Sequence, residues 1–265
     1  MNALDRGLTL LETLVQSSTD MGLSELARAA RTDKSSAFRL LGGLVAAGYV
    51  IQETETKKYR PTSKLVVLGS TVLSRIDLRQ AVRSCLARLV DRTGYTALLA
   101  ALVDGGWREI IYLDQAVPST AAVSVNIRVG RVAPSHCTSA GKAILAFLPE
   151  DQRTQIEGDL PSYTPRTLVS GAALRLHLEA VRALGYAVDD EEYREGLRCV
   201  SAPVRNHLGL VVGSLTLSAP AASLPLDEVH GLGRVVMEEA DVASRDMGWS
   251  PGLRIPSSVS HALAI

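Results

Sequence analysis

The stretch from residue 23 to residue 60 limits the possible folds of this chain more than any other part. Its apolar residues recur every three or four positions over two short segments, which predicts two helices joined by a tight turn. Two runs of strand-forming residues follow, and the sequence ETETKK between them predicts the turn of a hairpin. Two such helices followed by a hairpin are typical of a winged helix-turn-helix.

Polar residues and a glycine mark the ends of the two helices. We expect Ser24 to cap the first helix, because its hydroxyl can accept a hydrogen bond from the free amides of the first turn, and this helix should end near Ala30. Asp33 should cap the second helix, and Gly48 should close it. The expected buried face of the second helix consists of Ala37, Leu40, Leu41, Leu44 and Val45.

The second helix and the hairpin both present polar side chains, as a recognition helix and a wing present them to DNA. Taken singly, these features have ordinary alternatives: a helical hairpin needs no DNA, a lysine pair on a turn is usually solvated surface, and Arg6 can simply face water. Their order within one stretch favours binding to a double-stranded DNA operator. The predicted DNA contacts are Arg6, Ser24, Lys34, Ser35, Ser36, Arg39, Lys57, Lys58 and Arg60.

Positive charge is concentrated in this stretch although the whole chain is neutral. The chain holds 28 Lys and Arg residues and 28 Asp and Glu residues, so its overall field attracts no nucleic acid. Between residues 31 and 64, seven basic side chains stand against three acidic ones, an excess of four. Residues 1 to 30 hold two basic and four acidic side chains, so the excess lies where the recognition helix and wing are predicted.

Composition bounds the remaining classes of protein. A hydrophobic content of 46% over 265 residues is enough for one large domain or two modest ones. The three cysteines, Cys85, Cys137 and Cys199, are widely spaced, which disfavours a disulfide framework and a zinc finger. We find no leader and no apolar run near the length of a membrane span, and we therefore expect a soluble cytoplasmic protein.

Helices are predicted on both sides of the winged domain, which we place at residues 1–62. The first helix should brace the next two through Leu4, Leu8, Leu11, Leu14 and Val15. Residues 63–77 should form a helical linker, with Leu65, Leu68, Val72 and Leu73 at helical spacing. This apolar stripe exceeds what a small domain can bury. It suggests pairing with a second chain, since one recognition helix reads only a few base pairs.

The remainder of the chain predicts an α+β domain over residues 78–248, followed by a mobile tail at 249–265. Strands are expected at TALLAALV, REIIYLDQ, AAVSVNI, YAVDD, RCVSAPV and LVVGSLTLS. Helices are expected at about residues 78–94, 140–147, 149–157 and 172–184, and from about residue 227. Hairpins of strands with helices between them indicate a mainly antiparallel sheet with helices on its faces.

Several blocks of sequence resemble the IclR-type transcriptional regulators. These blocks are ALDRGLTLLETL, LSELARAA, KSSAFRLLGGLVAAGYV, YRPTSKLVVLG, HCTSAGKAILA, GYAVDDEEYREGLRCVSAPV and GSLTLSAP. The resemblance runs from about Ala3 to Met247. It implies a GAF-like effector-binding domain after the winged helix-turn-helix, and homodimers that often pair into tetramers.

A small-molecule effector site is predicted where Thr138 and Ser139 precede a helix, because hydroxyls and free amides at a helix start can bind an anion. The alternative is that these residues merely cap the helix. The resemblance implies that this segment lines the effector pocket, and it adds residues from later strands. The effector-binding set is Thr138, Ser139, Ala140, Asp189, Leu197, Cys199, Thr216 and Ser218.

Charged residues near this set are assigned no part in the site. Asp190, Glu191 and Glu192 are expected to form a solvated acidic loop, and for Lys142, two residues into the helix, facing water and facing the pocket are both left open. Thr216 and Ser218 are two positions apart, so both should point to one face of a strand.

The main hypothesis is a DNA-binding regulator that responds to a small organic metabolite, by family analogy an organic or aromatic acid. It needs no cofactor, metal or catalytic residue. One alternative is a cysteine-dependent hydrolase with Cys199 as nucleophile, His136 as base and Asp189 as orienting acid. Another is an interaction module that has lost DNA binding. A metal site at His136, Cys137 and Cys199 has only weak support, because no ligand pair has standard spacing.

Overall fold

The fold was obtained as a computed structural model, which describes every residue except 1, 74–76, 104–105, 120–124, 126 and 252–265. Internal contacts divide the described residues into two compact units, one within residues 2–73 and the other within 77–251. Each unit has its own apolar core. The narrower boundaries predicted at residues 62 and 248 remain predictions.

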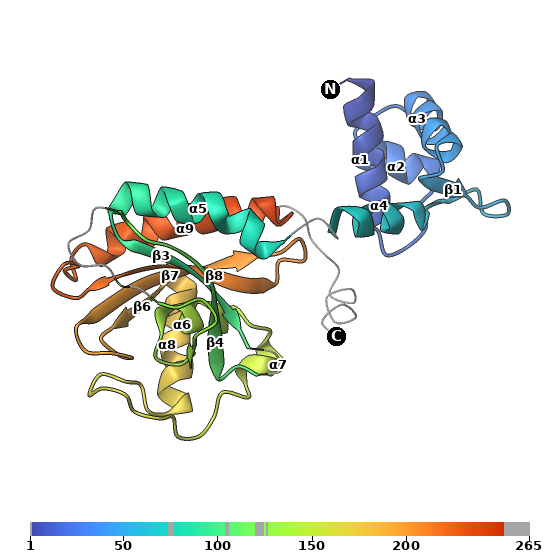
Figure 1. The fold of residues 1–265 in the computed structure, drawn as a ribbon. Coiled ribbons are helices and arrows are strands. Elements are labelled where there is room, and N and C mark those ends of the chain that lie inside the picture. Colours follow the sequence, from blue (N-terminus) through green and yellow to red (C-terminus); the bar gives the residue numbers. More distant parts are fainter. Residues whose placement is uncertain (1, 74–76, 104–105, 120–124, 126, 252–265) are drawn as a thin grey trace. The chain divides into compact units, whose positions relative to one another are not determined.

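The first unit is a winged helix-turn-helix, as the sequence predicts (Figure 1). Its elements are α1 (Ala3–Gln16), α2 (Leu23–Ala29), α3 (Lys34–Ala46), β1 (Val50–Gln52), β2 (Tyr59–Pro61) and α4 (Lys64–Leu73). β1 and β2 form an antiparallel hairpin in which Ile51 pairs with Arg60. The core that holds the three helices to the hairpin contains Leu10, Leu14, Leu26, Ala27, Ala30, Ala37, Leu41, Val50 and Tyr59.

The predicted cap at Ser24 is wrong, whereas the predicted cap at Asp33 is confirmed. α2 begins two residues earlier than expected, with Gly22 as its N-cap, because the Glu25 side chain accepts a hydrogen bond from the Gly22 amide at 2.7 Å. Asp33 accepts from the Ser36 amide at 2.8 Å and starts α3. Gly48 follows the end of α3 with a φ of 77°, a left-handed conformation that glycine adopts without strain.

The predicted buried faces of α1 and α3 are partly wrong. In α1, Leu10 and Leu14 are buried, whereas Leu4, Leu8 and Val15 are 69%, 48% and 51% exposed. The helix therefore carries two apolar faces, and only one of them packs on the rest of this unit. At the end of α3, Val45 is likewise exposed.

The second unit is built on a six-stranded, fully antiparallel sheet with the strand order β5-β4-β3-β8-β7-β6. The strands are β3 (Thr96–Leu102), β4 (Glu109–Ala116), β5 (Val132–Pro134), β6 (Ala187–Asp190), β7 (Leu197–Arg205) and β8 (Val211–Pro220). The helices are α5 (Leu78–Thr93), α6 (Ser139–Leu145), α7 (Glu150–Arg153), α8 (Gly171–Leu184) and α9 (Val229–Asp246). This α+β architecture confirms the predicted fold class.

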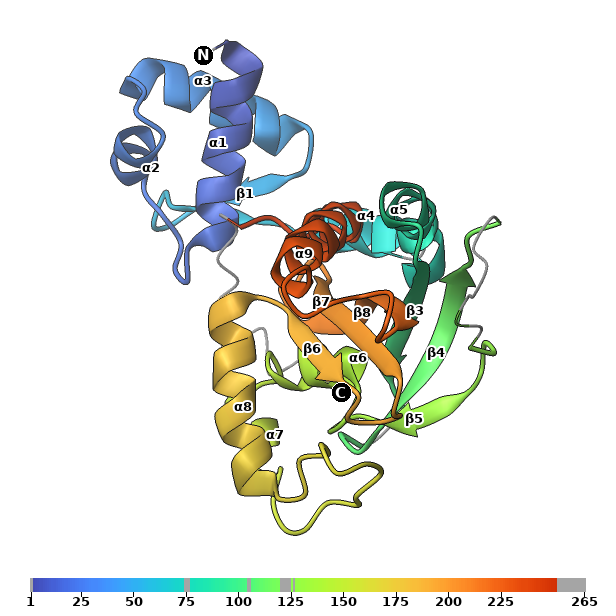
Figure 2. The same cartoon turned by 90° about the vertical axis from the view of Figure 1, so that its left-hand side faces the viewer.

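The sheet is covered on both faces. α5 and α9 lie side by side on one face, and α6 with α8 covers the other (Figures 1 and 2). Arg88 and Arg92 of α5 pair with Glu239 of α9, at 2.8 Å and 3.1 Å, and tie the first pair of helices together. The face beneath α6 is the one that carries the polar pocket described below.

One predicted helix of this unit is shorter than expected, and two predicted segments lie largely outside the described residues. AAVSVNI lies mostly outside the described residues, and the strand that pairs with β4 on its outer side is instead β5. The helix predicted at 149–157 is a single turn, because the chain leaves it at Thr154 and brings Ile156 fully into the core. The predicted tail also lies largely outside the described residues, which end at Pro251.

Candidate effector pocket and DNA-facing surface

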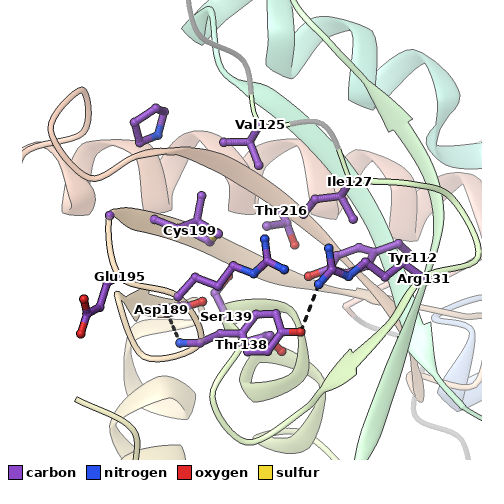
Figure 3. A pocket seen from close by; sticks show the side chains of 15 residues that line it. Tyr112, Val125, Ile127, Arg131, Thr138, Ser139, Asp189, Glu195, Cys199 and Thr216 are labelled. Carbon is purple, nitrogen blue, oxygen red and sulfur yellow. Dashed lines mark hydrogen bonds between the residues drawn. The ribbon is translucent and has the colours of Figure 1, made fainter. Parts of the chain in front are cut away.

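A cavity of about 260 Å³ opens in the second unit between the sheet, the start of α6 and the loop that joins β6 to β7 (Figure 3). Tyr112 and Arg131 lie together on one side of it, and Asp189 and Cys199 lie on another. Its lining residues are Tyr112, Val125, Ile127, Arg131, Thr138, Ser139, Asp189, Tyr193, Arg194, Glu195, Gly196, Leu197, Cys199, Thr216 and Pro220.

Six of the eight predicted effector residues lie in the wall of this cavity. The other two do not: Ala140 packs into the apolar core, and Ser218 is buried with its hydroxyl 3.1 Å from the Cys199 sulfur. Thr138 is also the N-cap of α6, since it accepts a hydrogen bond from the Gly141 amide at 3.2 Å. Capping and pocket lining are thus compatible at this position.

A chain of hydroxyl groups links two residues of the pocket wall, Ser139 and Thr216, through the buried Ser201. The Ser139 hydroxyl lies 2.7 Å from that of Ser201, which lies 2.7 Å from that of Thr216. Ser201 and Thr216 are opposite each other in the β7–β8 register, so their side chains share a face of the sheet. Ser201 was not predicted from the sequence to belong to the site. Its register with Thr216 is what would have revealed it.

Asp189 stands at the buried end of the pocket. Its carboxylate accepts hydrogen bonds from the backbone amides of Glu192 at 2.8 Å and Tyr193 at 3.4 Å. Burial raises the pKa of this carboxyl group to about 7, although the nearby Lys142 ammonium opposes the rise. Near neutral pH, the site can therefore hold Asp189 in either protonation state.

Lys142 and Glu192 form a buried ion pair behind the pocket, so the predicted solvated position of Glu192 is wrong, and Lys142, whose direction the sequence left open, faces Glu192. The Lys142 side chain is fully buried, and its ammonium donates to Glu192 Oε1. Thr167 donates to the Glu192 carbonyl at 2.6 Å. These contacts fasten the β6–β7 loop, which carries pocket residues 193–196, to α6 and to the segment before α8.

Two arginines give the pocket a positive side, and neither was predicted from the sequence to belong to the site. The Arg131 guanidinium donates to the Tyr193 hydroxyl at 3.4 Å, and Arg194 stacks over the Tyr193 ring at 5.7 Å. Arg131 precedes an unpredicted strand and Arg194 follows an acidic run, so neither has a local sequence signal. Tyr112, Val125 and Ile127 add apolar surface to the same cavity.

The described residues do not assemble the alternative hydrolase site. The His136 ring donates from Nε2 to the Pro161 carbonyl at 2.9 Å and lines a different cavity, beside Trp107 and Tyr163. Burial raises the pKa of the Cys199 thiol, which opposes formation of a nucleophilic thiolate. A catalytic cysteine requires the opposite shift and a base within hydrogen-bond reach.

Two other features are absent from the described part of the chain. No cluster of three or more His, Cys, Asp or Glu side chains there is arranged to hold a metal ion. None of its helices combines the length and the apolar character that crossing a membrane requires. Its three cysteines are buried free thiols.

The predicted DNA contacts lie on α3, on the hairpin and on neighbouring helices of the first unit. Lys34, Ser35 and Arg39 are exposed on α3. Lys57, Lys58 and Arg60 are exposed on the hairpin, Ser24 is exposed on α2, and Ser36 and Arg6 are half-buried.

At the start of α3, the Ser35 hydroxyl is already hydrogen-bonded within the chain. Ser35 donates to the Asp33 carboxylate at 2.6 Å, and this bond, with the one from the Ser36 amide, holds the pKa of Asp33 well below its usual range. The Ser35 hydroxyl can therefore accept a hydrogen bond from a partner more readily than it can donate one.

A winged helix-turn-helix followed by a separate domain with a polar, partly cationic pocket defines a ligand-responsive transcription factor. Family models agree for both domains. The IclR helix-turn-helix domain matches residues 3–54, and the bacterial transcriptional regulator IclR C-terminal domain matches residues 70–245. The chain belongs to the IclR family of transcriptional regulators.

Individual relatives support this assignment. The chain is 34% identical to the HTH-type transcriptional regulator XynR of Escherichia coli, over 94% of this chain and 98% of XynR. A putative IclR transcriptional regulator from Silicibacter is 25% identical, with a TM-score of 0.79 over 94% of this chain and 97% of that one. An IclR homolog from Microbacterium hydrocarbonoxydans, solved with 4-hydroxybenzoate, is 25% identical with a TM-score of 0.56, over 93% and 99% of the two chains.

Proposed function

We propose that this regulator senses a small organic acid, aliphatic or aromatic, in the pocket of its second unit. The observation that carries the proposal is the pair of arginines, Arg131 and Arg194, beside apolar surface in a cavity of about 260 Å³. Guanidinium groups bind carboxylates in bidentate fashion. A cavity of this volume suits a ligand smaller than a typical drug. The 4-hydroxybenzoate bound to the Microbacterium relative has this chemistry.

The pocket also offers groups for the rest of such a ligand. The carboxylate would meet Arg131, the carbon skeleton would lie against Ile127 and Tyr112, and a ligand hydroxyl would meet Ser139 or Asp189. In this arrangement Asp189 favours an anionic ligand most when it is protonated, because an ionised Asp189 would repel the ligand. The six predicted residues in the wall would be the contacts that set specificity.

Binding would then change the affinity for the operator in the bacterial cytoplasm. The loop at residues 191–196 belongs both to the pocket and to the buried network of Lys142 and Glu192, so ligand contacts at this loop reach the body of the domain. A difference in ligand affinity between two arrangements of the protein, worth about 1 to 3 kcal/mol, is sufficient for regulation.

We also propose that the chain acts as a homodimer, which can pair further into a tetramer. Leu4, Leu8 and Val15 on α1 and Val66 and Leu68 on α4 are large apolar side chains that this unit leaves exposed. Two recognition helices in one dimer would read two half-sites, which gives the specificity that one helix lacks.

The test is a titration of fluorescent DNA from the region upstream of its own gene, at fixed salt, with and without a panel of carboxylic acids. We expect one acid to change the affinity of the wild type and to have at least tenfold less effect on Arg131→Gln. Arg182→Gln, an exposed arginine on α8 outside the pocket, should respond like the wild type. A full response by Arg131→Gln would refute the assigned carboxylate site.

A further inference from the structure

α3 exposes a large aromatic side chain that its own domain does not use. Phe38 is 60% exposed, whereas the neighbouring Ala37 and Leu41 are fully buried. Phenylalanine is usually buried, and this chain contains only two, so an exposed phenylalanine is notable. A single exposed apolar residue is ordinary on most surfaces, but this one lies on the helix that the fold presents to DNA.

The position of Phe38 on α3 places it among cationic side chains. It lies one turn after Lys34 and next to Arg39, within the first two turns of a helix that Asp33 starts. Long side chains in a helix point back toward its N-terminus, so the Phe38 ring covers the turn that contains Lys34 and Ser35. In helix-turn-helix proteins, residues in these first turns reach base edges.

The next turn of α3 contains two residues without side chains. Gly42 and Gly43 follow Phe38 in the helix interior, where glycine lowers helix stability. A Cβ atom added at either position would meet nothing within 4 Å, so packing in this domain does not require these glycines. Their surface lets another molecule approach the helix backbone closely.

We infer that Phe38 reads sequence by packing on the C5-methyl group of a thymine in the major groove, while Lys34 and Arg39 hold the flanking phosphates. Phenylalanine is among the side chains that make this contact, and it requires no hydrogen bond. The inference rests on the proposed binding of DNA. A second copy of the chain is a poorer occupant, because Lys34 and Arg39 on two such faces would repel each other across a symmetric contact.

Replacing thymine by uracil tests this contact directly, since uracil keeps every base-pairing group and lacks only the methyl. The full-length wild type first selects a duplex from a random library at stated salt, and each thymine in the half-site is then changed singly. We expect one substitution to weaken wild-type binding about fourfold, the effect of one buried methyl-sized group. Phe38→Ala should bind the thymine duplex more weakly and should be insensitive to that uracil.

Val45→Ala is the matched control, because Val45 is also an exposed apolar residue of α3 but lies two turns further along. It should keep the wild-type response to uracil. The inference is overturned if no uracil weakens wild-type binding or if Phe38→Ala keeps the response to uracil. It is also overturned if sedimentation shows that Phe38→Ala binds DNA more weakly only because its oligomeric state has changed. Specific binding that does not depend on a methyl group refutes only the thymine contact of Phe38. Failure to select any duplex refutes the proposed DNA binding as well.

Discussion

At the scale of single residues, the buried Lys142–Glu192 pair has the largest expected effect on stability. Lys142→Met removes the ammonium that pairs with the Glu192 carboxylate and leaves a buried acid without its countercharge. We expect the free energy of unfolding to fall by about 3 to 5 kcal/mol, as when one member of a buried pair is deleted. Urea unfolding at neutral pH measures this change.

The double variant Lys142→Met/Glu192→Leu supplies the control for this prediction. With both charges gone, the free energy of unfolding should recover by at least half of the loss. A single variant as stable as the wild type, or a double variant no better than the single one, would show that the pair does not hold the loop.

Asp189 makes stability depend on pH near neutrality. Its pKa is about 7 in the folded protein and near 3.8 when exposed, so the folded state holds the proton more tightly. Between these values the folded state binds more protons than the unfolded state, and its stability therefore falls as the pH rises. The contribution is fully present below pH 3.8 and is lost above about pH 7.

The measurement compares wild type with Asp189→Asn, which stays neutral, by urea unfolding at pH 5 and pH 8. We expect the stability of the wild type relative to the variant to decrease at pH 8. Burial also raises the pKa of Glu192. Because Glu192 is present in both proteins, its contribution to the pH dependence of stability cancels to first order in the difference between them. A difference that stays constant or grows with pH would contradict the assigned shift.

Residue identity alone could not predict these buried charges. Lysine and glutamate are usually solvated, and Lys142 and Glu192 are brought together only when α6 packs beside the β6–β7 loop. Thr138 was found because it precedes a helix, and Asp189 was found because the family resemblance named it. Arg131 matched no motif. Ser201 lies within one of the blocks that carry the resemblance, but its contact with Thr216 follows only from strand register.

At the scale of elements, α6 depends on a glycine at its contact with the preceding loop. A Cβ atom at Gly141 would lie 2.2 Å from the carbonyl oxygen of Ser135 and 2.3 Å from its Cα. Both atoms belong to backbone, so the contact cannot be relieved by a side-chain rotation. Gly141→Ala should lower the free energy of unfolding by about 3 kcal/mol, by overpacking.

Gly231→Ala is the matched substitution for this test, because it lies in α9 of the same unit and its added Cβ meets nothing within 4 Å. It should raise the free energy of unfolding by about 0.5 to 1 kcal/mol. Equal effects of the two substitutions in thermal or urea unfolding would mean that the α6 contact is looser than the structure shows.

Periodicity predicted most elements of the fold, but it predicted less well which groups those elements contact. The strands YAVDD, RCVSAPV and LVVGSLTLS correspond to β6, β7 and β8, since apolar alternation and turn residues are local signals. The cap of α2 was misplaced because Glu25, not Ser24, makes the decisive bond. In α1, spacing identified an apolar stripe but could not tell which stripe faces the same chain.

At the scale of the whole molecule, the second stripe of α1 provides the last prediction. Leu8 is 48% exposed, at helical spacing from Leu4, and we propose that a second chain covers both. Leu8→Glu places a charge in that interface and leaves the core at Leu10 and Leu14 intact. We expect dissociation into monomers, measured by sedimentation, and weaker operator binding, since each monomer then reads one half-site.

Leu176→Glu is the control, because Leu176 is 77% exposed on α8 of the other unit and its replacement tests only the addition of a charge. It should keep both the wild-type mass and operator affinity. If Leu8→Glu also keeps them, the exposed stripe of α1 is not the interface. The exposed apolar residues of α4 would then have to provide the pairing that two half-sites require.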